Sequence, residues 1–216
     1  MVRYLLPSLA TLVLLAVLLA GCSQQGASSA PGTPVVTTIM ATTTIETTPV
    51  PAATPEPFPG ALSVGTPYTY GREDIAMEVN VYKVKVMDGY EWWSPKWGRY
   101  WNTSPKEGNH FLFTFVRLID RGTARARLPS TPMFVLHADG NSYIETTDRD
   151  NSLSIRGIPV KQYEYFFERT AGYIDPAESN KVEGFLLFEV PSTVDPAGAY
   201  LEGTFSSKAG AVWKLG

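Results

Sequence analysis

The sequence has little of what most catalytic and metal sites require. Its 216 residues include one cysteine, Cys22, and two histidines, His110 and His137. A disulfide needs two cysteines and a thiolate zinc site needs several, so neither forms within this chain. Neither a Gly-x-Ser-x-Gly nor a His-Glu-x-x-His motif occurs, and these motifs mark many serine and zinc hydrolases. The sequence therefore predicts a non-enzymatic protein with no catalytic residue, no metal and no cofactor.

An excess of positive charge is also missing. The chain carries 18 Lys and Arg against 21 Asp and Glu, a formal net charge of −3 at pH 7. Proteins that bind nucleic acid through phosphate contacts concentrate Lys and Arg on one surface. We therefore expect no nucleic-acid partner.

The hydrophobic run at the start of the chain is short. The apolar stretch 5–20 is interrupted by Pro7 and two hydroxyl residues, and it follows Arg3. A membrane-spanning helix needs about 20 continuous apolar residues. A secretory signal peptide instead has a positive start, a shorter apolar segment and small residues at its end. Residues 1–21 are therefore predicted to be a signal peptide.

The segment Leu19-Ala20-Gly21-Cys22 at the end of this signal resembles the lipobox of prokaryotic lipoproteins. The resemblance implies cleavage before Cys22 and a thioether-linked diacylglyceryl group on its sulfur. Two acyl chains hold a protein stably at a membrane, because each buried methylene contributes about 0.8 kcal/mol and one chain alone binds marginally. We expect an exported protein, lipid-anchored on the outer face of a prokaryotic cytoplasmic membrane. The alternative is an ordinary cleaved signal in which Cys22 has no role.

Residues 22–60 combine the lipidated cysteine with a linker that cannot build a core. Half of the segment 23–60 is Thr, Pro or Ser, and its only charges are Glu46 and Glu56. Such a tract buries too little apolar area to offset chain entropy, so we expect it to be disordered. It would span roughly 34 Å as a coil and up to about 118 Å as polyproline II. Its composition also suits O-glycosylation.

Residues 61–216 alternate apolar and polar side chains between Gly, Pro, Asn and Asp clusters, which predicts an all-β, immunoglobulin-like sandwich of about eight strands. The change of parity between Val81 and Tyr82 predicts a β-bulge or a strand that passes between sheets. Asp139-Gly140 predicts a tight hairpin turn. The expected strands are 75–87, 111–119, 133–138, 142–147, 162–168, 182–190, 199–205 and 211–215.

Residues 71–215 resemble the DUF4352 family of secreted and lipidated proteins. The resemblance implies an immunoglobulin-like (telokin-like) β-sandwich and no catalytic residues. Its carriers are Gly108-Asn109-His110-Phe111, Phe134-x-Leu136, Asp139-Gly140-x-x-Tyr143, Gly184-Phe185-Leu186-Leu187-Phe188-Glu189-Val190-Pro191 and Trp213-Lys214-Leu215.

The segment 90–101 holds six aromatic residues, including four of the five tryptophans. Pro95 and Gly98 favour a loop, and no strand pattern fits all six rings. Loops that present Trp and Tyr can stack on sugars, rest at a lipid interface or anchor a partner protein. The structural alternative is a loop that folds back over one end of the sandwich, and we expect Trp93 and Trp101 to be packed and Trp97 exposed. The candidate binding residues are Trp92, Trp93, Trp97, Tyr100 and Trp101.

Arg121, Arg125 and Arg127 concentrate positive charge after the central strand. They could contact lipid headgroups or an anionic wall polymer, and the alternative is an ordinary solvated loop. Together, the sequence predicts a membrane-anchored cell-surface lipoprotein whose domain binds or scaffolds a protein or a cell-wall glycan. The alternative function is a carbohydrate-binding module that uses the aromatic segment.

Overall fold

The computed structural model describes residues 56–146, 154–177 and 179–216. The predicted signal peptide, the lipidation site Cys22 and the linker as far as residue 55 lie outside the described residues. Within the described part of the chain, no helix has the length and hydropathy needed to cross a membrane.

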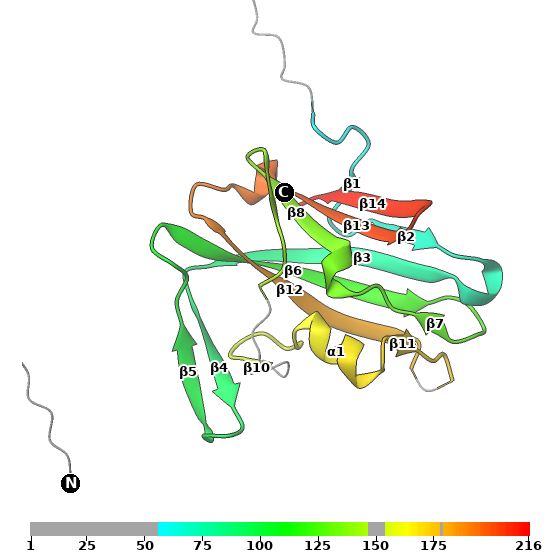
Figure 1. Ribbon diagram of the computed structural model, residues 1–216, viewed down its shortest axis with the longest axis horizontal. Helices are drawn as coiled ribbons and strands as arrows, with labels where there is room; N and C mark the ends of the chain where they lie inside the picture. Colours follow the sequence, from blue (N-terminus) through cyan, green and yellow to red (C-terminus); the bar gives the residue numbers. More distant parts are fainter. Residues whose placement is uncertain (1–55, 147–153, 178) are drawn as a thin grey trace, which may run out of the picture. The chain divides into compact units, whose positions relative to one another are not determined.

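Two large open sheets form the framework (Figure 1). The five-stranded sheet has the order β1 (Leu62–Ser63), β14 (Ala209–Lys214), β13 (Tyr200–Ser206), β8 (Phe134–Ala138) and β9 (Asn141–Tyr143). The four-stranded sheet has the order β12 (Lys181–Pro191), β6 (Asn109–Asp120), β3 (Met77–Met87) and β2 (Pro67–Tyr70). All neighbouring pairs are antiparallel except β1 and β14.

Smaller elements complete the fold. One three-stranded sheet contains β10 (Ser154–Ile155), β4 (Tyr90–Ser94) and β5 (Arg99–Thr103), and a two-stranded sheet pairs β11 (Tyr173–Ile174) with β7 (Ala126–Arg127). The helices are α1 (Tyr163–Arg169) and the 3-10 turns η1 (Glu73–Ile75), η2 (Thr131–Met133) and η3 (Pro196–Gly198). The described residues form 14 strands where the sequence predicted about eight, because several strands are only two residues long.

The all-β sandwich predicted from the sequence is confirmed. Side chains from both large sheets form one buried cluster, the sandwich core, which includes Phe134, Phe188 and Trp213. The central strand β6 is covered on both faces, as its nearly continuous apolar sequence predicts. Leu112, Val116 and Leu118 enter the sandwich core. The alternate residues Phe111, Phe113 and Phe115 enter a second cluster on the other face, the outer cluster, with Tyr90, Ile155, Ile158, Phe185 and Leu187.

Two local features follow the sequence closely. The register of β3 against β6 shifts between Val81 and Lys83, so the expected β-bulge is present. Asp139 and Gly140 both have positive φ, 49° and 74°, and they connect β8 to β9. Positive φ at both central residues is what a type I′ turn requires, and Asp and Gly tolerate it.

The strand predicted over 162–168 is wrong, because this segment is the helix α1. Tyr163, Phe166 and Phe167 are spaced at three and four residues, which places all three on one helical face, and they pack against the sandwich core. Gly184 of β12 permits this contact, since a Cβ there would lie 2.8 Å from the Cα of Tyr163.

The residues just before β1 contact the five-stranded sheet, although the sequence assigned them to the linker. The Glu56 carboxylate accepts hydrogen bonds from Lys214 Nζ at 2.8 Å and Tyr200 Oη at 3.1 Å. The ring of Phe58 lies 5.1 Å from the rings of both His137 and Tyr200. These contacts fix where the described chain enters the sandwich.

Candidate functional site

The aromatic segment is a β-hairpin, which corrects the predicted loop. Strands β4 and β5 pair in register, with Trp92 opposite Trp101 and Trp93 opposite Tyr100. The short strand β10 joins the free edge of β4. The segment has no alternating pattern because large rings occupy both faces of the two strands. We call residues 90–103 the aromatic hairpin, and Figure 1 shows it extending beyond the large sheets.

The base of the aromatic hairpin is anchored in the outer cluster. Tyr90 is buried there, with its ring 5.0 Å from that of Phe111. Trp92 is half-buried against the same cluster, and its indole Nε1 donates a hydrogen bond of 3.1 Å to Thr103 Oγ1. The hairpin therefore rises from a packed base on the four-stranded sheet.

The distal part of the aromatic hairpin presents its rings to solvent. The exposed fractions are 62% for Trp97, 42% for Tyr100, 39% for Trp93 and 37% for Trp101. The expected exposure of Trp97 is confirmed, whereas the expected packing of Trp93 and Trp101 is wrong. Paired strands explain the difference, because this small sheet extends away from the large sheets and rings on both of its faces can reach water. These four residues do not plug the end of the sandwich.

Cationic side chains lie against the exposed rings. The Arg99 guanidinium is 4.0 Å from the centre of the Trp101 ring, and the Arg156 guanidinium is 4.1 Å from that of Tyr100. Lys96 Nζ lies 5.4 Å from the centre of the Trp97 ring. Such pairs are attracted by the negative ring face and hold ring and cation in a fixed relation. The hairpin surface is therefore both aromatic and basic.

One acidic group balances part of this charge. Glu91 forms an ion pair of 2.6 Å with Arg156, which also stacks on Tyr100. The ring of Trp93 meets that of Tyr100 edge-on at 5.3 Å. Lys96 and Arg99 form no ion pair within the described residues. The surface can thus offer large rings and two cations whose charge is not paired to a partner.

The three arginines predicted to contact anions lie in different surroundings. Arg121 forms an ion pair of 2.9 Å with Glu78. The Arg125 guanidinium stacks on the Tyr173 ring at 4.3 Å, and Arg127 is paired with Tyr173 along the β7–β11 ladder. Only Arg125 of the three lines the cleft beside α1 that is described below.

A serine, a histidine and a glutamate align on the five-stranded sheet, which the sequence did not indicate. Ser142 Oγ lies 3.0 Å from His137 Nδ1, and Glu202 Oε2 lies 2.8 Å from His137 Nε2. The residues come from β9, β8 and β13, so only strand pairing brings them together. In a hydrolase triad the histidine presents Nε2 to the serine and Nδ1 to the carboxylate, and here the two ring nitrogens are exchanged.

The carboxyl group of Glu145, just after β9, is largely buried. Burial raises the pKa of Glu145 to about 7, with a smaller contribution from the charge of Glu164. Gln162 Nε2 donates a hydrogen bond of 3.0 Å to Glu145 Oε1. Within the described residues, no group of three or more His, Cys, Asp or Glu side chains could hold a metal ion.

No family model matches the sequence, and no curated protein is detectably similar to it. Solved structures with weak likeness include a candidate lipoprotein of Bacillus subtilis, ycdA, at TM-score 0.40 and 17% identity, covering 69% of this chain and 38% of that one. The yjhA protein of Bacillus subtilis matches at TM-score 0.42 and 14% identity, over 72% of this chain and 99% of that one. An uncharacterized β-sandwich protein of Clostridium difficile matches at TM-score 0.41 and 12% identity, over 72% and 95%. This chain spans well under half the length of ycdA.

Proposed function

We propose that this protein is an exported, lipid-anchored and non-enzymatic binding protein whose β-sandwich contacts a partner protein through the aromatic hairpin. The observation that carries the proposal is the exposure of Trp93, Trp97, Tyr100 and Trp101 on one hairpin. Complete burial of a large apolar side chain contributes roughly 1.5 to 3 kcal/mol, so the exposed part of each ring forfeits a share of that free energy. Several such rings on one projecting element favour a surface that is covered in a complex.

The chemistry of the aromatic hairpin favours a protein partner. Trp, Tyr and Arg are the residue types that contribute most binding energy in protein interfaces, and the hairpin combines all three. Lys96 and Arg99, which form no ion pair in the described part of the chain, add positive charge, so an acidic patch on the partner complements the hairpin. The packed base formed by Tyr90 and Trp92 keeps the exposed rings in place, which lowers the entropy lost on binding.

A carbohydrate-binding module is the second candidate function, and the exposed ring of Trp97 supports it. Sugars stack on flat, open aromatic faces. Arg99 and Arg156 already lie over Trp101 and Tyr100, so these two rings offer less open face to a sugar. This occupancy makes a protein partner the better supported proposal.

Photo-cross-linking tests the proposal and separates the two candidates. We expect p-benzoylphenylalanine at position 97, in cells that make the full protein, to give one discrete protein adduct. The matched control is position 144, because Ile144 is 78% exposed but lies outside the hairpin. An adduct at 97 that glycosidases degrade would favour the carbohydrate-binding module. Equal labelling from both positions would refute a specific role of the hairpin.

The lipid anchor is supported by the lipobox segment that ends at Cys22. We infer DUF4352 membership and export from the motifs quoted above, and the Thr/Pro-rich linker would hold the domain away from the membrane. We expect Cys22→Ser to release the protein from membranes after a carbonate wash, whereas Ser23→Ala, its matched control, stays bound. Retention of the Cys22→Ser variant would contradict the anchor.

A non-enzymatic role can be tested at the Ser142, His137 and Glu202 alignment. The histidine presents Nδ1 to the serine and Nε2 to the glutamate, the reverse of the arrangement in serine hydrolases. We expect the parent and His137→Ala to hydrolyse p-nitrophenyl acetate at the same background rate. Turnover that is lost in both His137→Ala and Ser142→Ala would contradict this proposal.

A further inference from the structure

A basic cleft lies at the opposite end of the four-stranded sheet from the aromatic hairpin. Strand β6 begins beside the hairpin, where Phe111 pairs with Met87, and ends beside the cleft, where Ile119 pairs with Lys181. A strand of this length spans roughly 40 Å. The cleft is bounded by α1, β11 and the start of β12, and its volume is about 630 Å³. That volume is in the range of small-molecule sites, roughly 300 to 1,000 Å³.

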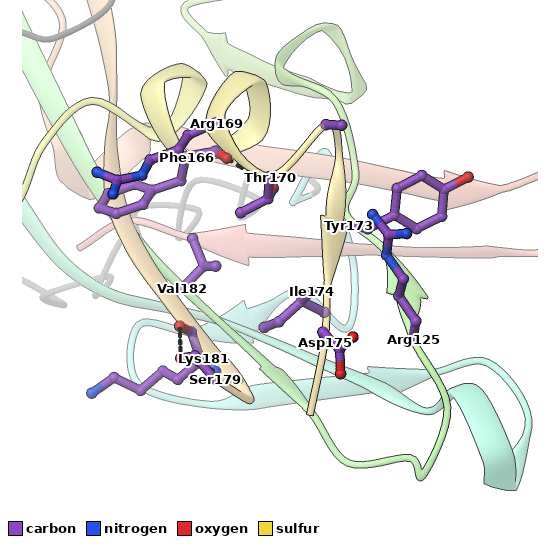
Figure 2. A pocket seen from close by; sticks show the side chains of 11 residues that line it. Arg125, Phe166, Arg169, Thr170, Tyr173, Ile174, Asp175, Ser179, Lys181 and Val182 are labelled. Atoms are coloured by element: carbon purple, nitrogen blue, oxygen red, sulfur yellow. Dashed lines mark hydrogen bonds between the residues drawn. The ribbon is translucent and has the colours of Figure 1, made fainter. Parts of the chain in front are cut away.

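The lining of the basic cleft combines an apolar floor with a cationic rim (Figure 2). Ile174 and Val182 belong to the sandwich core, and Phe166 packs against it, so these three side chains hold the floor in place. Arg125, Arg169 and Lys181 supply positive charge. Figure 2 shows Arg125 beside Tyr173, on the other side of the cleft from Lys181.

Tyrosine side chains hold the two arginines in position. Arg125 stacks on Tyr173 at 4.3 Å, and Arg169 Nη1 donates a hydrogen bond of 2.8 Å to Tyr165 Oη. Neither forms an ion pair within the described residues. Lys181, by contrast, forms an ion pair, with its Nζ 3.2 Å from Glu183 Oε1.

One acidic residue, Asp175, also lines the cleft. Its Oδ1 accepts a hydrogen bond of 2.9 Å from the backbone N–H of Ala177. The described lining therefore has three cations against one carboxylate. Guanidinium groups recognise carboxylate and phosphate oxygens with paired N–H donors.

We propose that the basic cleft is a binding site for a small amphipathic anion, with its acidic headgroup at Arg125 or at Arg169, which Figure 2 shows on opposite sides, and its apolar body on Phe166, Ile174 and Val182. The apolar floor and the two arginines, which have no carboxylate partner among the described residues, favour a ligand with both properties. This inference is independent of the aromatic hairpin and of its proposed partner.

Fluorescence titration with 8-anilinonaphthalene-1-sulfonate, an amphipathic anion, tests the proposal. The full chain carrying Cys22→Ser is used so that no acyl chain competes for the apolar floor. We expect saturable binding that weakens about tenfold or more when Arg125→Gln and Arg169→Gln are combined, because the cleft then has no guanidinium group on either side for the charged headgroup. Binding of the uncharged N-phenyl-1-naphthylamine should change less than twofold.

Three controls keep the test decisive. Arg99→Gln alters the aromatic hairpin and Arg72→Gln alters an exposed arginine paired with Asp74, and neither should weaken binding of the sulfonate probe. Arg125→Lys retains charge and should keep most of the affinity lost in Arg125→Gln. A loss of affinity in Arg99→Gln that matches the cleft variant, or an unchanged affinity in the double cleft variant, would overturn the proposal.

Discussion

The sandwich core and the aromatic hairpin are both rich in large rings, yet they use them in opposite ways. In the core, Phe134, Phe188 and Trp213 are fully buried between sheets. In the hairpin, Trp97 is 62% exposed and has a lysine beside its ring. Aromatic content alone therefore does not separate packing from recognition. The difference lies in whether another layer of the fold covers the ring: the core rings lie between two sheets, whereas Trp97 lies in the turn between β4 and β5.

The largest expected effect is in the sandwich core. We expect Phe188→Ala to lower the free energy of unfolding by about 3 to 5 kcal/mol, because the lost ring leaves a cavity between two sheets. That is a large share of the roughly 5 to 15 kcal/mol that stabilises a domain. Urea denaturation measures the change. A loss below 1 kcal/mol would contradict the burial of Phe188 between the two sheets.

The next largest effect is the pH dependence of stability that the buried carboxyl group of Glu145 produces. Burial raises the pKa of Glu145 from 4.5 to about 7, so between these pH values the folded state binds more protons than the unfolded state. Stability therefore falls as pH rises through this window, and the full cost is present above pH 7. We expect Glu145→Gln to stabilise the protein by about 2 to 3 kcal/mol above pH 7 and by nothing below pH 4.

Glu189 is the matched control for this pH dependence. Hydrogen bonds from Asn109 and from the backbone N–H of Lys106 lower the pKa of its carboxyl group. Its contribution is present at neutral pH and is lost as pH falls, which is the opposite sign. Thermal melts of both Gln variants from pH 4 to pH 8 check the prediction, and parallel pH profiles for the two would contradict it.

The base and the tip of the aromatic hairpin should also differ. Trp92 is half-buried and donates to Thr103, so we expect Trp92→Ala to cost about 1 to 2 kcal/mol. Its register partner Trp101 is the matched control, because it lies opposite on the same ribbon but is exposed. Urea denaturation should show a clearly smaller loss for Trp101→Ala. Equal losses of unfolding free energy would show that Trp101 stabilises the fold as much as Trp92 does.

The smallest expected effect is at the tip. Trp97→Ala removes a ring that is mostly in water, so the free energy of unfolding should change by less than about 0.5 kcal/mol. Acrylamide quenching provides a second reading, since the Trp97→Ala variant should lose its most quenchable component. A melting temperature lowered as much as in Trp92→Ala would show that Trp97 packs.

The regions that could be predicted from the sequence are strands with a regular apolar pattern, on one face or on both, and turns with a specific residue pair. Alternation in β3 and the change of parity at Tyr82 predicted the bulge, and Asp139-Gly140 predicted the turn. The helix α1 was not predicted because it has only seven residues, and so short a segment with several aromatic residues fits a strand pattern as well. The strands of the hairpin were missed because rings on both faces erase the alternation.

Candidate functional residues could be predicted where they are close together in the sequence, and not where only the fold brings them together. Composition alone singled out the aromatic segment, because four of five tryptophans fall within 12 residues. The basic cleft and the Ser142–His137–Glu202 alignment could not be predicted, since their members are far apart in sequence and meet only through strand pairing and helix packing. Exposure of each ring likewise depends on a fold that composition does not specify.

The central claim is that the exposed rings of the aromatic hairpin serve recognition and not folding. The most direct measurement places p-benzoylphenylalanine at position 95, in the same turn as Trp97, and compares adduct yield with and without Trp97→Ala and Trp101→Ala. Large rings at the centre of an interface contribute about 2 kcal/mol or more, so we expect a loss of adduct of about tenfold or more in a protein that remains folded. An unchanged adduct yield in the folded double variant would contradict it.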